Sequence, residues 1–363
     1  MNAQHILLVT NIGIISCCLA VVLLIVLTKL RRTVRQTRTA AKIGPYRHAL
    51  LAVATGEDDD GKGRRELYAI SSRVWKHMDS AVVSMLSHVR GAPAEVLAGT
   101  LRGHGEIDRA TAMTRSRSAV KRSRAAYLLG LVRDTASVPV LLPLLSDKSD
   151  EVRLVATRAL GAIGEPATAE AVIEALRIRR GRIGVPAWIA EEALLGMGVG
   201  IGPVLLKALK DDEHGIRNVA ATVVGLGTYP SAAPELRQLL AYDLSSEVRR
   251  SAAVALGQVG GDGDVGAIGA HTGPGHPTPL RRICVEALGE LGSPQALPKL
   301  RALLADDDRR LAEMAGESMV RIGDAGVTEL RIAATGDDEG ARIARAALDL
   351  ARLRGPLPSV GEA

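Results

Sequence analysis

The chain has 363 residues, of which 47% are hydrophobic and only 2% aromatic, and its formal net charge is +6. The apolar fraction excludes disorder along the whole chain, and the scarcity of alternating β-branched and aromatic runs excludes β-sandwiches and barrels. Three Cys, two of them adjacent, cannot form a disulfide framework. A chain without Phe is expected to pack Leu, Val, Ile and Ala in thin helical layers.

The first predicted element is a membrane anchor within residues 1–28. Residues 6–27 are 22 positions without a charge, and as a helix they span roughly 33 Å, enough for a hydrocarbon core of about 30 Å. The basic residues that follow are candidate contacts for anionic lipid headgroups: Lys29, Arg31, Arg32, Arg35, Arg38 and Lys42. The positive-inside rule then predicts a single-pass protein of the cytoplasmic membrane, with its N-terminus outside and the rest in the cytosol.

A cleaved leader is the alternative to this anchor. Ile14-Ile15-Ser16-Cys17 resembles a bacterial lipoprotein cleavage box. Cleavage there would leave ten apolar residues after the new N-terminus, and no basic region precedes the apolar run. The sequence therefore favours an uncleaved span.

The basic excess lies next to the predicted anchor. Residues 29–124 hold 20 Lys and Arg against 9 Asp and Glu, whereas residues 125–363 hold 26 against 31. A solenoid that binds nucleic acid would carry Lys and Arg along its repeats. The charge distribution therefore argues against nucleic acid as a partner.

Residues 29–118 combine the basic juxtamembrane segment with helices expected over 48–54, 67–86 and 93–102. These helices lack the repeat that follows, so they are either degenerate capping units or a separate small helical domain. Residues 56–63 contain three Gly and three Asp and are predicted to be an exposed linker.

Residues 119–353 repeat with a period near 32. EVRLVATRALGAIGEP from Glu151 matches EVRRSAAVALGQVGGD from Glu247 in an aliphatic–Arg pair, a small residue and an apolar–Gly pair. The Gly recurs at Gly130, Gly161, Gly196, Gly225, Gly257 and Gly289. A second apolar stretch follows in each unit at helical spacing, so each unit is expected to hold two helices of about ten to twelve residues. Residues 354–363 are expected to be a disordered tail.

The pattern resembles HEAT repeats, particularly the short bacterial variety called phycobilisome-lyase-like, in seven to eight units. The resemblance implies an all-α chain: an α-solenoid of two-helix repeats after a single N-terminal transmembrane helix. It also implies a right-handed superhelix whose concave face is lined by the second helices and binds protein. Similar bacterial single-span proteins accompany membrane-bound enzymes such as glycosyltransferases, which suggests a membrane-associated protein partner.

Five residues stand out as candidate contacts. Arg153, Arg217, Arg249 and Arg281 occupy the same place in their units, and acidic turns such as Asp243 separate the units. The column is either an Asp–Arg ladder between neighbouring units or a basic ridge for an acidic partner. Trp188 stands in a unit that lacks the Arg, as a local repacking or as an exposed anchor for a partner. The Gly- and Pro-rich stretch 269–279 is either a binding loop or a slack connection.

Catalytic chemistry finds little support in the sequence. Deoxyhypusine hydroxylases, a HEAT-type enzyme family, hold a di-iron centre with repeated His-Glu pairs, and none of the eight His here precedes Glu. Cys284 lies on an apolar helix and is expected in the core. We therefore expect no catalytic residue, no metal site and no cofactor, and a scaffold or adaptor rather than an enzyme. The alternatives are a bilin-lyase-like enzyme and a nucleic-acid-binding HEAT-like protein.

Overall fold

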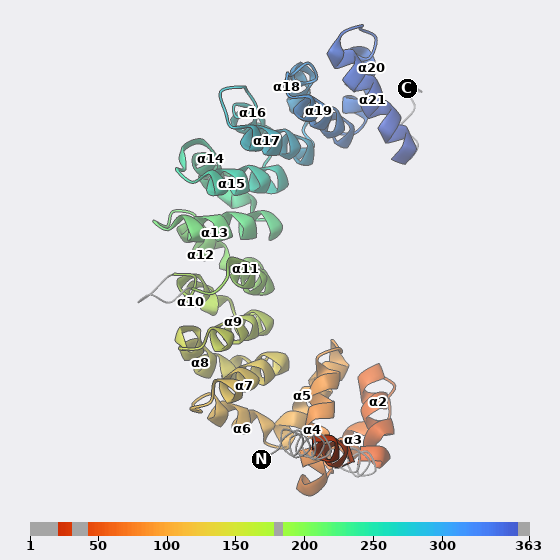
Figure 1. Cartoon of the computed structure of the whole chain (residues 1–363), viewed down its shortest axis with the longest axis vertical. Helices are drawn as coiled ribbons and strands as arrows, with labels where there is room; N and C mark the ends of the chain where they lie inside the picture. Colours follow the sequence, from red (N-terminus) through yellow and green to blue (C-terminus); the bar gives the residue numbers. More distant parts are fainter. Residues whose placement is uncertain (1–20, 31–42, 178–183, 355–363) are drawn as a thin grey trace, which may run out of the picture. The chain divides into compact units, whose positions relative to one another are not determined.

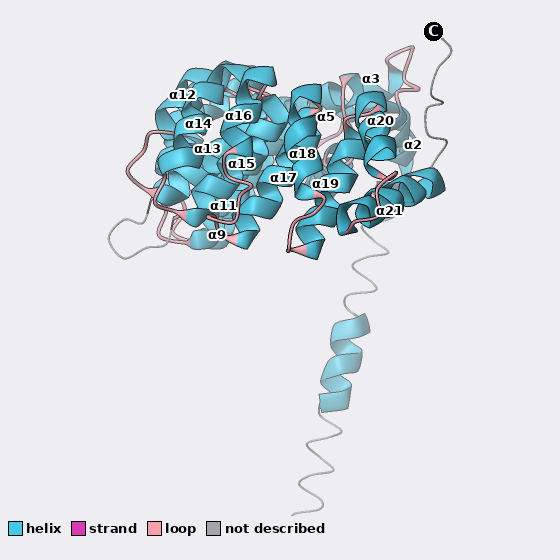
Figure 2. Cartoon of the chain, turned by 90° about the horizontal axis from the view of Figure 1, so that it is seen from above, coloured by secondary structure: helices cyan, strands magenta, loops and turns pink. Residues whose placement is uncertain are grey.

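The computed structural model describes residues 21–30, 43–177 and 184–354, and every regular element within these ranges is a helix (Figure 2). The predicted membrane span lies mostly outside them. Its described part belongs to a short apolar helix, Val21–Leu30, with exposed side chains. Among the described residues, no single helix is long and apolar enough to cross a membrane. The consecutive helices Ala187–Gly196 and Gly198–Ala208 are long and apolar enough together, but the chain bends by 120° between them. Of the candidate headgroup contacts, Lys29 is in the short helix and the other five lie outside the described residues.

The chain divides into two compact units, Met1–Ala110 (unit 1) and Thr111–Ala363 (unit 2). The helices of unit 1 are α2 (Arg47–Thr55), α3 (Lys62–Tyr68), α4 (Ser72–Leu86) and α5 (Ala92–Gly103), and α6 (Glu106–Met113) crosses the division. The single helix expected over 67–86 is thus two helices. The chain turns between them because Ser71, the residue before α4, has an extended backbone with φ −64° and ψ 145°.

One Trp fills the centre of unit 1. Trp75 of α4 is buried, and its ring stacks on His104 with 3.8 Å between the ring centroids. Its Nε1 donates a hydrogen bond to Oε1 of Glu106 at 2.7 Å, and His104 Nε2 lies 3.0 Å from the carbonyl oxygen of Leu67. The indole therefore has a partner for its one polar atom and packs its apolar surface inside the unit.

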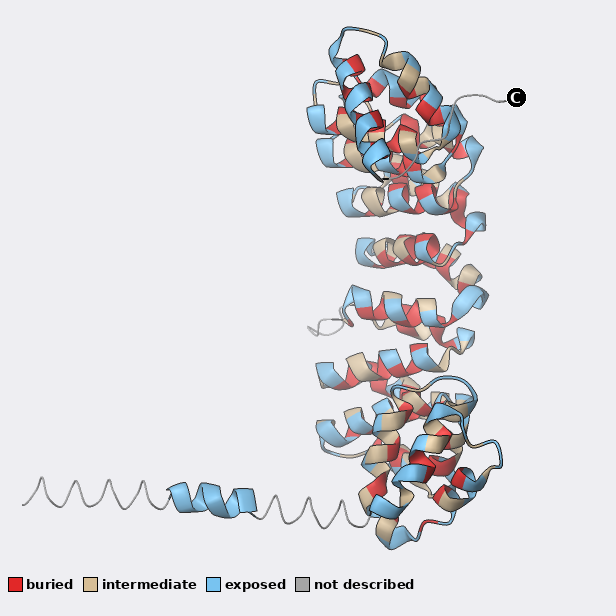
Figure 3. Cartoon of the chain, turned by 90° about the vertical axis from the view of Figure 1, so that its right-hand side faces the viewer, coloured by how far each residue is buried: buried red, intermediate tan, exposed pale blue. Residues whose placement is uncertain are grey.

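Unit 2 alternates longer and shorter helices. The first helix of each layer carries the repeated Arg and Gly positions: α7 (Ala119–Val132), α9 (Asp150–Ile163), α11 (Ala187–Gly196), α13 (His214–Leu226), α15 (Ser246–Val259), α17 (Thr278–Leu291), α19 (Arg309–Arg321) and α21 (Glu339–Arg354). The second helix follows it: α8 (Val138–Leu141), α10 (Ala169–Glu174), α12 (Gly202–Ala208), α14 (Ala233–Tyr242), α16 (Val265–Gly269), α18 (Leu297–Leu303) and α20 (Asp324–Ala333). The two-helix repeat predicted from the sequence is confirmed as an all-α solenoid. Buried residues recur along the helices of unit 2 (Figure 3).

The second helices are shorter than the expected ten to twelve residues in all but two units. Most are entered through a 3-10 turn, such as Gly198–Ile201 before α12 and Pro294–Ala296 before α18. Pro203 and Pro298 then stand near the start of the α-helix. Proline lacks the N–H that an α-helix interior requires, so it is tolerated only in the first turn and leaves fewer residues for the α-helix itself.

The repeated Gly brings neighbouring first helices into close contact. A Cβ added to Gly130 would lie 2.5 Å from Cα of Ala159, and one added to Gly257 would lie 2.9 Å from Cα of Ala287. The second helices make far fewer contacts with one another. Layers that approach closely along one side curve toward that side, and Figure 1 shows α11, α13, α15 and α17 on the inner side of unit 2. The resemblance placed the second helices there; the first helices line the concave face instead.

Candidate functional site: an arginine ladder along the turns

A complete rung of the ladder is an Arg that binds two successive turns, as Arg217 does. Arg217 of α13 donates from Nε and Nη2 to the carboxylate of Asp243 at 2.6 and 3.0 Å, in the turn after the next second helix. Its Nη1 donates to the carbonyl oxygens of Asp211 and Asp212, in the turn before α13. The guanidinium therefore holds one turn by its backbone and the next by its acid, with the parallel geometry that makes Arg–carboxylate pairs strong.

The acid of each rung also starts a helix. Oδ1 of Asp243 accepts the backbone N–H of Ser245 at 2.8 Å, directly before α15, and Asp147 holds Ser149 before α9 in the same way. Burial by itself raises the pKa of Asp243, but the hydrogen bonds from Arg217 and from the Ser245 N–H outweigh it and hold this pKa below its ordinary value. The acidic turns that separate the units therefore serve both the helix start and the contact between units.

Two further rungs have the same form. Arg281 of α17 pairs with Asp306 and donates from Nε to the carbonyl oxygen of Thr272. Arg122 of α7, which the sequence reasoning missed, binds Asp147 at 2.7 and 2.6 Å and the carbonyl oxygen of Ser116 at 2.8 Å. Arg122 precedes Arg153 by 31 residues, so extending the repeat spacing one unit earlier would have found it.

In the unit that lacks the repeated Arg, an Arg from another position forms the rung. Val185 occupies the place 32 residues before Arg217, and its rung is filled by Arg177, from the chain just after α10. Arg177 binds Asp211 at 2.5 Å and Glu213 at 2.9 Å, and these hydrogen bonds raise its pKa. No sequence signal marked this residue, because it comes from a different place in the repeat.

Arg153 binds its own helix start and the turn before it. It is 6% exposed, its Nη2 lies 2.9 Å from Oδ1 of Asp150, and its Nη1 donates to the carbonyl oxygen of Asp147. The position 32 residues after Asp147 is Arg179, which lies outside the described residues. Arg153 therefore binds the turn before it, as the other rungs do.

Arg249 of α15 differs from the other members of the column. Its Nε is buried and makes no hydrogen bond, and it is the one buried side-chain nitrogen or oxygen in the described ranges without a partner. Leaving such a donor unpaired costs about 1–3 kcal/mol. The rung is open because the next turn supplies no acid.

Trp188 lies on α11 with more than half of its surface exposed. The guanidinium of Arg158 sits over its ring, 4.9 Å from the centroid, and Arg158 also pairs with Glu192 at 3.2 Å. The indole is therefore fixed from the neighbouring first helix while its outer surface remains open to solvent. The exposed indole is not a core residue, and its role as an anchor for a partner stays a prediction.

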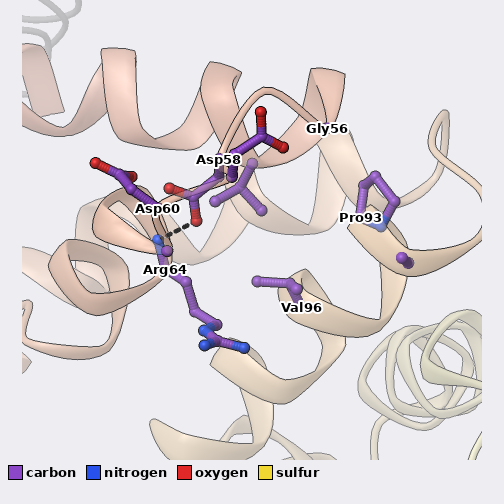
Figure 4. Close-up of a pocket in the computed structure, with 10 residues that line it drawn as sticks. Gly56, Asp58, Asp60, Arg64, Pro93 and Val96 are labelled. Atoms are coloured by element: carbon purple, nitrogen blue, oxygen red, sulfur yellow. Dashed lines mark hydrogen bonds between the residues drawn. The ribbon is translucent and has the colours of Figure 1, made fainter.

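The acidic segment 56–63 of unit 1 borders a pocket of about 400 Å³ that Val96, Pro93 and Arg64 also line (Figure 4). The segment is not merely a linker, because Asp58 accepts the backbone N–H groups of Gly63 and Arg64 at 2.6 and 2.8 Å. These contacts hold the start of α3.

Metal-binding and reactive side chains are sparse in the part of the chain that the structure describes. It contains no group of three or more His, Cys, Asp or Glu arranged to hold a metal ion. The His-Glu pairs of the di-iron enzymes are likewise missing from the sequence, so the residues present do not fit that centre. Cys284 lies fully buried on α17, and burial raises the pKa of its thiol to about 12. It occupies the same place in its unit as Ala252 and is a core residue.

Comparison with known proteins agrees with this fold. The family model for HEAT repeats matches residues 107–183, 202–268 and 276–351. Mouse deoxyhypusine hydroxylase is 28% identical over 245 residues, covering 59% of this chain and 80% of the mouse protein. The CpcE–CpcF phycocyanin lyase structure from Nostoc is 20% identical, with a TM-score of 0.32 and coverage of 67% and 94% of the two chains.

A structure of Kap95p with RanGDP has a TM-score of 0.51 at 14% identity, covering 87% of this chain and 52% of that chain. At this identity the likeness shows the fold alone. The three matched stretches together cover more than half of the residues, and they include most helices of unit 2, with α11 lying between two of them. The chain belongs to the HEAT-repeat family.

Proposed function

We propose that this protein is a non-enzymatic scaffold that binds a protein partner along the first helices of unit 2. HEAT-repeat solenoids are generically protein-binding scaffolds, and the observation that carries the proposal here is Trp188. It is the more exposed of only two Trp, and Arg158 already orders it. Exposed, ordered Trp residues are enriched among the few side chains that dominate binding energy at protein interfaces.

The rigidity of the surface around Trp188 supports the same proposal. Gly–Ala contacts set the distance between first helices, and the arginine ladder fixes the turns at their ends. Asn218 of α13 and Ser251 of α15 add a cross-layer hydrogen bond at 2.7 Å. A preorganised surface loses little conformational entropy when a partner binds.

Substitution of Trp188 tests this proposal. Full-length chain with Trp188→Ala, purified gently from its native membranes after crosslinking, is expected to lose a stoichiometric protein partner that the unchanged chain retains. Val199→Ala is the matched control, because Val199 is also highly exposed and lies in the following turn. Recovery of lipid and bait alone from the unchanged chain, or equal partner recovery from both variants, would overturn the proposal.

We further propose that residues 6–27 anchor the scaffold in the cytoplasmic membrane, with the repeats in the cytosol. The support is the uncharged run of 22 residues and the basic residues that follow it. The partner is then expected to be membrane-associated, and a membrane-bound enzyme such as a glycosyltransferase is the kind that the sequence resemblance suggests. Deletion of residues 6–27 should move the chain to the soluble fraction, whereas Cys17→Ala should leave it in the membrane. Release by Cys17→Ala would indicate a lipoprotein instead.

A further inference from the structure

The open rung at Arg249 has a definite cause in the sequence. Each rung acid lies six residues before the Arg position of its own unit, as Asp211 does for Arg217 and Asp243 for Arg249. The corresponding residue before Arg281 is Gly275. Residues 269–279 contain no Asp or Glu at all, so no other side chain of this turn can replace the missing carboxylate.

The place that Gly275 leaves is open. A Cβ added to Gly275 would meet no atom within 4 Å, and the same holds for Gly273. The turn also holds two imidazoles, His271 and His276, with 4.8 Å between ring centroids. The buried Nε of Arg249 therefore lacks the carboxylate that its rung would otherwise hold, and the turn that would supply this carboxylate has room at Gly273 and Gly275.

The neighbouring turn supplies exposed apolar surface. Leu244, directly after the rung acid Asp243, is 99% exposed, and Tyr242 is 77% exposed. In the 32-residue register, Asp243 corresponds to Gly275, so these two side chains occupy the turn next to the open one. Two side chains this exposed on one turn offer apolar surface that a residue of a partner can cover.

We propose that Arg249, the loop 269–279 and the turn at Tyr242–Leu244 form a docking site for an acidic segment of a protein partner. An Asp or Glu of the partner takes the place of the missing rung acid, and an apolar residue beside it packs against Tyr242 and Leu244. The chemistry is that of Arg217 with Asp243, supplied from another chain. Charge complementarity selects this occupant, because the open rung presents a guanidinium without a carboxylate. The inference rests on the proposed scaffold function and names the chemistry of one contact.

The turn that completes the neighbouring rung provides the probe. The acetylated and amidated peptide Tyr-Asp-Leu-Ser-Ser copies residues 242–246, and the control peptide carries Asn in place of Asp. Both are titrated into the full-length chain labelled with ¹⁵N-arginine, and the Nε–Hε signal of Arg249, assigned through Arg249→Lys, reports binding. We expect a saturable shift with the Asp peptide and binding that is about fivefold or more weaker with the Asn peptide, since a charge-assisted bidentate pair is lost.

A second variant tests the same rung from inside the chain. Gly275→Asp should shift the Arg249 signal without peptide and abolish the response to the peptide. No saturable shift, equal shifts with both peptides, or inorganic phosphate binding at least as tightly as the Asp peptide would overturn the inference. Capture of the partner by a chain with Arg249→Gln, at the level of the unchanged chain, would also overturn it while leaving the scaffold function standing. The partner capture with Trp188→Ala tests the scaffold function alone, so failure of the scaffold function and failure of the docking site give different results.

Discussion

The Gly column predicts that a single methyl group between two first helices destabilises unit 2. In Gly130→Ala the new Cβ would lie 2.5 Å from Cα and 2.6 Å from Cβ of Ala159. Ordinary carbon contacts need about 3.5–4.0 Å, so α7 and α9 must separate by roughly 1 Å. Overpacking of this kind costs about 1–3 kcal/mol, while Ala gains up to about 1 kcal/mol over Gly in a helix interior. With the full propensity gain subtracted, the expected net loss is about 0–2 kcal/mol, and the loss relative to a Gly→Ala change without steric contact is about 1–3 kcal/mol.

Gly215→Ala is the matched control. Gly215 lies on α13, and a Cβ added there would meet no atom within 4 Å. Only the helix-propensity term applies, so this variant is expected to be neutral or up to about 1 kcal/mol more stable. Urea denaturation compares the two variants, and hydrogen exchange locates the effect, which should concentrate in α7 and α9 because repeat arrays do not unfold as one cooperative unit. A Gly130→Ala chain as stable as Gly215→Ala would refute the close-packing argument.

The remaining predictions concern the ladder and the buried thiol. Because Asp243 has a lowered pKa when folded, the unfolded chain binds more protons, so the stability from this rung is complete above the unfolded pKa of about 4 and is lost as the pH falls through the folded value. Asp243→Asn should lower the free energy of unfolding at pH 7, measured by urea denaturation, by about 2–4 kcal/mol. It should also make the free energy of unfolding fall less steeply between pH 5 and 3. An unchanged pH dependence in that range would contradict this. Arg177→Met should destabilise the layer of α11 and α13, seen as faster hydrogen exchange there, whereas Arg309→Met, at a side chain that is 79% exposed, should not. Cys284 should resist iodoacetamide at pH 8 until denaturant is added, measured by mass spectrometry of its peptide, because its thiol pKa is about 12; rapid labelling of the native chain would show the site to be open.

Much of unit 2 could be predicted from the sequence because each layer packs against its neighbours through residues at the same positions of the repeat. The recurring Arg and Gly placed Arg217 and Arg281 at equivalent positions, and their acids could be named from the turns. The replacement of the missing Arg by Arg177 could not be found in this way, since it depends on how the chain after α10 reaches the next turn. The side on which the layers curve follows from the Gly column, but only once Gly130 is seen to face Ala159.

Unit 1 was less predictable because it has no internal repeat to compare. The burial of Trp75 against His104 joins residues 29 positions apart in sequence, and no spacing rule signals such a stack. The break between α3 and α4 depends on the backbone of Ser71, which the helical pattern of the flanking residues concealed. The predicted membrane span remains a prediction.

The close contacts of the first helices also determine how unit 2 can deform. Gly130 and Gly257 already hold their neighbours at the limit of steric approach, so the stack cannot curl further toward its concave side. Flattening is different, because it only separates these helices and brings together second helices that touch little. Unit 2 is therefore expected to resist bending toward its concave side more strongly than flattening away from it.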